Sequence, residues 1–180
     1  KIIVLGGDER EMVMVRYLTE SGAKVYTVGH MPYSGQSGII RTESLGQYPE
    51  ALPIADVIIA PMSHTDEKGQ VRNVPDKEQV IIIDDALLGR FPPGTPFFIG
   101  VARPNIKELC QRHKLRLIET AEIDQIAILN SIPTAEGAIQ IAMEELPITI
   151  HGAKAVVLGM GRCGMTLARM LHCLGAKVVV

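Results

Sequence analysis

The chain has 180 residues, of which 47% are hydrophobic and 21% charged, and its formal net charge at pH 7 is −2. This balance is typical of an ordinary globular protein and excludes the basic surface that nucleic-acid or anionic-membrane binding would need. No apolar run approaches the roughly 18 residues that span a bilayer. The three cysteines, Cys110, Cys163 and Cys173, lack C-x-x-C spacing, which fits a reducing cytoplasm.

A strand-turn-helix-strand unit opens the chain. Apolar residues predict a strand over Ile2–Leu5, and glycines at positions 6 and 7 predict the turn after it. A helix with one apolar face is predicted over Met12–Leu18, and a second strand ends at Val28. The chain therefore begins with the βαβ unit from which doubly wound parallel sheets are built.

The turn of this first unit is predicted to serve the substrate and not a dinucleotide. Asp8 and Glu11 stand where a dinucleotide motif has glycines, and their charge and bulk would oppose a pyrophosphate. Arg10 lies near the carboxyl end of the first strand, where open α/β sheets bind ligands, and its guanidinium can hold a carboxylate bidentately. The alternative is that Asp8 only caps the helix and Arg10 pairs locally at the surface.

The middle of the chain supplies more strands and two further candidate site residues. Gly, Ser, Pro and Tyr predict a long loop over 30–53, broken by a short element at residues 39 and 40. A buried strand over Ala55–Pro61 is followed by Ser63, whose hydroxyl could bind a ligand, and by His64, which could act as acid or base. Both are also ordinary turn residues.

Three further strands and one helix are predicted before residue 119. The strands cover Val80–Ile83, Pro96–Val101 and Leu115–Ile118, and the helix covers Asn105–Lys114. This alternation of strand and helix predicts an α/β fold with a doubly wound parallel sheet of flavodoxin or Rossmann type. We assign residues 1–119 to this Rossmann-like substrate domain.

Residues 120–150 are predicted to form interdomain helices. A first helix covers Ala121–Leu129, and a second, in which Pro133 takes an early position, runs to about Leu146. Helices that join two domains place polar groups in the cleft between them, where a nicotinamide would meet its substrate. The substrate-side candidates in the predicted interruption are Asn130, Ser131, Thr134 and Glu136, with Glu136 also a candidate catalytic base. The alternative is that these four are capping and turn residues.

The last thirty residues carry a dinucleotide motif. An apolar run ending at Leu158 leads into Gly159, Gly161 and Gly164, spaced G-x-G-x-x-G at the start of a predicted helix. The first glycine permits a tight turn, the second lets a pyrophosphate approach and the third allows close packing, while the helix N-terminus attracts the phosphates. The predicted cofactor-binding residues are Gly159, Gly161, Arg162, Gly164 and Met165. The alternative is a tight turn that binds nothing.

The chain stops at Val180, inside the second strand of this unit. The residue that would read the ribose 2′ position follows that strand, so the choice between NAD and NADP stays open. We therefore expect residues 151–180 to be the first, truncated βαβ unit of a Rossmann NAD(P)-binding domain in a longer protein. The segment alone is expected to be inactive, because half of the cofactor site would be missing.

Three stretches together resemble the A subunit of dipicolinate synthases. They are Gly6-Gly7-Asp8-x-Arg10-Glu11, the run from Asp124 to Gly137 with Asn130-Ser131-Ile132-Pro133-Thr134 at its centre, and the run from Ile150 to Met165 that contains the three glycines. The resemblance spans nearly the whole chain. The run from Asn130 to Gly137 is more specific than the glycine motif, which many dehydrogenases share.

The resemblance implies an oxidoreductase that converts dihydrodipicolinate, or its hydrated precursor, to dipicolinate with NADP or NAD during sporulation. It implies a dicarboxylate substrate, a partner that is the flavoprotein-like B subunit of dipicolinate synthase, and the cytoplasm of the mother cell, and it leaves a homo-oligomer open. One alternative is another NAD(P)-dependent dehydrogenase of alanine or 2-hydroxy-acid type, although the Lys/His pair or Arg/Glu/His set of those enzymes is not complete here. The other is a nucleotide-sensing subunit without turnover.

Overall fold

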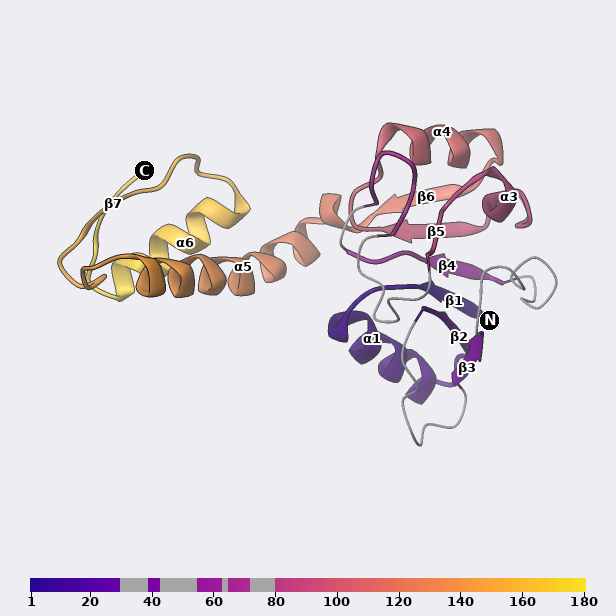
Figure 1. The fold of residues 1–180 in the computed structure, drawn as a ribbon, viewed down its shortest axis with the longest axis horizontal. Coiled ribbons are helices and arrows are strands. Elements are labelled where there is room, and N and C mark those ends of the chain that lie inside the picture. Colours follow the sequence, from indigo (N-terminus) through magenta and orange to yellow (C-terminus); the bar gives the residue numbers. More distant parts are fainter. Residues whose placement is uncertain (30–38, 43–54, 63–64, 72–79) are drawn as a thin grey trace. The chain divides into compact units, whose positions relative to one another are not determined.

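The computed structural model describes residues 1–29, 39–42, 55–62, 65–71 and 80–180, and the chain divides into two compact units. Unit 1 is Lys1–Ala121 and unit 2 is Glu122–Val180 (Figure 1). Among these residues, no helix has the length and apolar character needed to cross a membrane.

Unit 1 is built on a six-stranded parallel sheet (Figure 1). Its strands are β1 (Ile2–Leu5), β2 (Val25–Val28), β3 (Ile39–Thr42), β4 (Val57–Ile59), β5 (Pro96–Ile99) and β6 (Arg116–Glu119). Their order is β3-β2-β1-β4-β5-β6, and every neighbouring pair is parallel. This is the Rossmann order and not the flavodoxin order, so the predicted doubly wound sheet is confirmed and its type is decided.

Helices cover both faces of this sheet. The helices of unit 1 are α1 (Glu9–Glu20), α3 (Asp85–Leu88) and α4 (Pro104–Arg112). A 3₁₀ turn at Thr120–Glu122 spans the boundary between the two units in the sequence. Val4 of β1 packs with Val15 of α1, whereas Ile3 faces the opposite core, to which α4 contributes Ile106. Side chains alternate along a strand, so β1 contributes to a core on each face of the sheet.

The predicted strand at Val80–Ile83 is wrong. This segment forms no strand of the sheet but an isolated antiparallel bridge between Gln70 and Ile82. Its backbone pairs with the preceding excursion, because Val71 donates to the carbonyl of Ile81 at 2.9 Å. Ile81 and Ile83 are nevertheless buried in the core. The apolar alternation of residues 80–83 therefore indicates which side chains are buried, but it wrongly predicts that the segment joins the sheet.

Unit 2 contains two helices and a two-stranded parallel sheet. The elements are α5 (Asp124–Glu145), β7 (Lys154–Val156), α6 (Arg162–Cys173) and β8 (Lys177–Val179), with β7 paired to β8. Ile139 of α5 and Leu171 of α6 share a core with Val157, which follows β7. The βαβ unit predicted at the end of the chain is present.

The predicted break between two interdomain helices is wrong, because α5 is one helix of 22 residues with Pro133 inside it. Proline removes the amide that would bond the carbonyl of Leu129. Neighbouring hydroxyls bond carbonyls of the same turns: Thr134 Oγ1 donates to Asn130 O at 2.8 Å and Ser131 Oγ to Ile128 O at 2.6 Å. Packing against α6 keeps the helix continuous despite the proline.

Candidate nucleotide and substrate sites

The three glycines after β7 have the geometry that a dinucleotide turn requires. Gly159 has φ +102°, which a residue with a side chain rarely adopts. A Cβ on Gly164 would collide with the carbonyl oxygen of Gly159, whereas a Cβ on Gly161 would meet nothing within 4 Å. The first glycine therefore makes the turn, the third allows strand and helix to pack, and the second leaves open space in front of the backbone.

The start of α6 has no side-chain cap, because Gly161 is the N-cap and makes no side-chain hydrogen bond. Helix N-termini of this kind attract anions through their amides and the helix dipole. Arg162, the first residue of α6, lies 3.1 Å from Asp124 Oδ1 through its Nη1, and Met165 on the first turn is exposed. These residues fit the pyrophosphate of a dinucleotide, and Arg162 supplies a positive charge beside it.

The corresponding turn of unit 1 is filled by its own carboxylate. Glu11 is 6% exposed, and its Oε2 accepts a hydrogen bond from the Asp8 amide at 2.8 Å. Its Oε1 accepts another from the Met62 amide, just beyond β4, at 3.0 Å. The side chain lies directly under Gly7, where even a Cβ would touch it. Both amides are thus bonded to a carboxylate of the chain itself. That this turn serves the substrate and not a dinucleotide stays a prediction.

Arg10 is engaged by its neighbour. Its Nε donates to Asp8 Oδ1 at 2.9 Å and its Nη2 to Asp8 Oδ2 at 2.7 Å. Asp8 also caps α1 in a capping box, in which the Asp8 side chain accepts from the Glu11 amide and the Glu11 side chain accepts from the Asp8 amide. The side-chain hydrogen bond from Arg10 is the main reason that the pKa of Asp8 lies well below its usual range. The local pairing given as the alternative is therefore observed, and substrate contact by Arg10 stays a prediction.

The candidates on α5 point in different directions. Ser131 is fully buried, and its hydroxyl bonds Thr166 of α6 at 2.7 Å. Asn130 and Thr134 share one face of the helix, whereas Thr134 and Glu136 are about 200° apart around its axis, because each residue adds about 100°. A continuous helix therefore separates Glu136 from Asn130 and Thr134. Substrate binding by these residues stays a prediction, with a packing role for Ser131 now observed.

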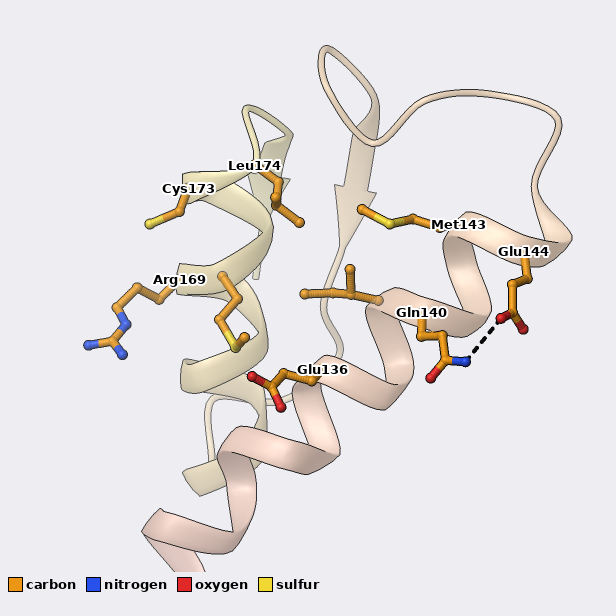
Figure 2. A pocket seen from close by; sticks show the side chains of 9 residues that line it. Glu136, Gln140, Met143, Glu144, Arg169, Cys173 and Leu174 are labelled. Atoms are coloured by element: carbon orange, nitrogen blue, oxygen red, sulfur yellow. Dashed lines mark hydrogen bonds between the residues drawn. The ribbon is translucent and has the colours of Figure 1, made fainter.

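Glu136 lies on a groove between α5 and α6 (Figure 2). The groove has a volume of about 900 Å³ and is lined by Glu136, Ile139, Gln140, Met143 and Glu144 of α5, with Arg169, Met170 and Cys173 of α6 and the following Leu174. Its floor is apolar, and its charged groups stand at the rim. In Figure 2 the carboxylate of Glu136 points toward α6 and away from Gln140 and Glu144.

Ser63 and His64 lie outside the described residues, so their predicted roles stay predictions. Among the residues that are described, no group of three or more His, Cys, Asp or Glu could hold a metal ion. Arg103 was not among the sequence candidates. It follows β5 and precedes α4, and its Nε donates to the Thr65 carbonyl at 2.7 Å. An arginine that lies between a strand and a proline at a helix start is a signal that the sequence did offer.

Comparison with known proteins agrees with this architecture. The family described as the N-terminal domain of the dipicolinate synthase A subunit matches residues 1–121. The A subunit of dipicolinate synthase from Bacillus subtilis (strain 168) is 39% identical over 181 residues, covering 100% of this chain and 60% of that protein. The chain thus spans about three fifths of the length of this curated relative.

Solved structures give the same result. The crystal structure of the dipicolinate synthase A subunit from Bacillus halodurans has a TM-score of 0.85 at 32% identity, covering 98% of this chain and 59% of that one. The corresponding chain of the Bacillus subtilis enzyme has a TM-score of 0.83 at 36% identity, covering 98% and 58%. D-2-hydroxyisocaproate dehydrogenase, at 14% identity and TM-score 0.51 with coverage of 98% and 51%, shares the fold alone. The chain belongs to the family of dipicolinate synthase A subunits.

Proposed function

We propose that this chain forms part of an NAD(P)-dependent dehydrogenase that oxidises dihydrodipicolinate, or its hydrated precursor, to dipicolinate during sporulation. Family membership supports the reaction, and the geometry of the glycine turn at Gly159, Gly161 and Gly164 is the observation that carries the cofactor. The proposed partner is the flavoprotein-like B subunit, and the proposed location is the cytoplasm of the mother cell.

The residues of unit 2 would hold the cofactor through its pyrophosphate. The open backbone at Gly161 lets the phosphates approach, the first amides of α6 donate to them, and Arg162 adds a positive charge. When bound, the nicotinamide supplies a hydride acceptor. Forming the aromatic ring from dihydrodipicolinate removes one hydride and one proton, so a base of the protein must take the proton. The hydrated precursor would in addition lose one water. Glu136 and His64 are the proposed candidates.

The test uses the full-length protein with its proposed partner. Product is followed by the absorbance of pyridine-2,6-dicarboxylate, formed from enzymatically generated dihydrodipicolinate with NAD or NADP supplied. Gly161→Ala should leave the fold intact, because its Cβ meets no atom within 4 Å, yet it should occupy the space that the pyrophosphate needs. We expect a rise in the KM for the nicotinamide of about tenfold or more, which is about 1.4 kcal/mol.

Gly137→Ala is the matched control, because it also adds a methyl group in open space in unit 2, within α5. It should leave that KM unchanged. Nicotinamide binding without product, whichever partner and cofactor are supplied, would favour a nucleotide-sensing role. Turnover of an alanine-type or 2-hydroxy-acid substrate instead would favour a different dehydrogenase.

A further inference from the structure

Arg103 is an arginine held in place at the edge of the unit 1 sheet where ligands of this fold bind. It follows the carboxyl end of β5 and forms the N-cap of α4. The Nε atom donates to the carbonyl oxygen of Thr65 at 2.7 Å, and the residue is half-buried. Within the part of the chain that the structure describes, nothing accepts a hydrogen bond from its two Nη atoms.

Arg10, the cation first predicted for this role, differs in that respect. Its Nε and Nη2 are already bonded to Asp8, at 2.9 and 2.7 Å. A substrate carboxylate that bound this side of the guanidinium would have to displace Asp8, whose pKa is low because Arg10 stabilises the charged form. Arg103 is anchored by a neutral carbonyl, so its full charge and the forked Nη pair remain for an anion.

The surroundings of Arg103 offer further unfilled hydrogen bonds. No side chain caps the start of α4, whose first residue, Pro104, has no amide hydrogen. Thr65, the residue that anchors Arg103, is fully buried, and among the described residues its hydroxyl has no hydrogen-bond partner. A buried hydroxyl without a partner is costly, and such groups concentrate where a ligand or a local rearrangement completes the bonding.

We propose that Arg103 binds a carboxylate of the substrate. The anion site would be formed by Arg103, the start of α4 and residues 65–71, here called the Thr65 segment. This rests on the proposed function for the identity of the substrate, a cyclic dicarboxylate. Asn105 Nδ2 donates to the Glu67 carbonyl at 3.1 Å, so a second side chain holds the same segment against α4. The site is thus ordered before the ligand arrives, which lowers the entropic cost of binding.

The proposal is tested by calorimetric binding of pyridine-2,6-dicarboxylate to the full-length protein, alongside turnover. Arg103→Ala should raise the dissociation constant about tenfold to a hundredfold, the range that a lost charge-assisted hydrogen bond gives. Arg103→Lys should recover only part of the loss, because an ammonium lacks the fork. Arg116→Ala is the matched control. Arg116 is exposed and begins β6, so it lies at the amino ends of the strands, whereas Arg103 follows a carboxyl end.

Asn105→Ala separates binding from simple loop anchoring. It removes a neighbouring bond to the Thr65 segment without removing charge, so it should weaken dicarboxylate binding much less than Arg103→Ala does. Equal weakening in Asn105→Ala and Arg103→Ala would show that Arg103 only holds the segment. Unchanged binding in Arg103→Ala would also overturn the anion site, even if the enzyme turns over. Binding through Arg103 without product would instead count against the dehydrogenase.

Discussion

At the scale of single residues, Glu11 shows how a buried carboxylate can hold a turn together. It spans the exits of β1 and β4 by accepting from the amides of Asp8 and Met62. In an open α/β sheet with this strand order, β1 and β4 flank the point where ligands usually bind. Glu11 is therefore a structural tie between the ends of these two neighbouring strands.

Replacing Glu11 should therefore destabilise unit 1. Glu11→Gln turns one of two acceptors into a donor that faces an amide donor, and leaving a buried donor unpaired costs about 1–3 kcal/mol. Urea unfolding followed by tyrosine fluorescence measures this, since all four tyrosines of the chain precede residue 121. Glu9→Gln, on the exposed side of the same helical turn, should cost about 0.5 kcal/mol or less. Equal effects in the two variants would contradict the tie.

The pair of Asp8 and Arg10 should make unit 1 sensitive to acid. Arg10 holds the pKa of Asp8 below its usual value, so the pair stabilises the fold above the unfolded pKa of about 3.9 and loses that effect as the pH falls further. Arg10→Gln should lower the urea midpoint at neutral pH, and the difference from wild type should shrink below about pH 4. A difference that stays constant down to about pH 2 would contradict this assignment.

At the scale of elements, sequence patterns correctly predicted the helices and strands whose formation depends mainly on their own residues. The capping residues and apolar spacing of α1, and the apolar runs of β1, β4 and β5, could be recognised in the sequence because each depends on its own residues. The structure of the segment Val80–Ile83 could not, since its apolar alternation fits the core whether its backbone joins the sheet or pairs with residues 69–71. The continuity of α5 could not be predicted either, because packing on α6 overrides the helix break that Pro133 favours.

Pro133 should accordingly limit the stability of α5. Pro133→Ala restores an amide donor and removes the steric clash, which favours a helix interior by up to about 3 kcal/mol. Thermal unfolding followed by helical circular dichroism should show a rise in the midpoint. Gly137→Ala, in open space on the same helix, should give a smaller rise of about 1 kcal/mol. A fall in the midpoint for Pro133→Ala would mean that the proline shapes the packing of α5 on α6.

At the scale of the whole molecule, the candidate site was only partly predictable. The glycine turn could be read from spacing, because its geometry belongs to a few consecutive residues. The pairing of Arg10 with Asp8, the burial of Ser131 against Thr166 and the anchoring of Arg103 to Thr65 could not. Each of these contacts depends on which side chains meet after folding. An arginine or a serine can bond many different partners, so its residue type alone does not predict which one it will have.

The accessibility of the three cysteines can be measured in both units in one labelling experiment. Cys110 in unit 1 is buried, and burial raises the pKa of its thiol to about 11, so about one molecule in a thousand carries its thiolate at pH 8. Cys163 and Cys173 in unit 2 are exposed. A maleimide should therefore label these two quickly in the native chain and Cys110 only after unfolding. Fast native labelling of Cys110 would contradict its placement in the core.

The same thiols can locate the cofactor in the full-length protein. Cys163 lies between Arg162 and Gly164 in the dinucleotide motif, whereas Cys173 ends α6, about 15 Å further along the helix. Saturating NAD or NADP should slow the labelling of Cys163 severalfold and leave Cys173 unaffected, as peptide mass spectrometry would show. Equal slowing at both cysteines would indicate a general tightening of unit 2. Protection of neither would contradict a dinucleotide bound at Gly161, because a pyrophosphate there must cover the residues beside it.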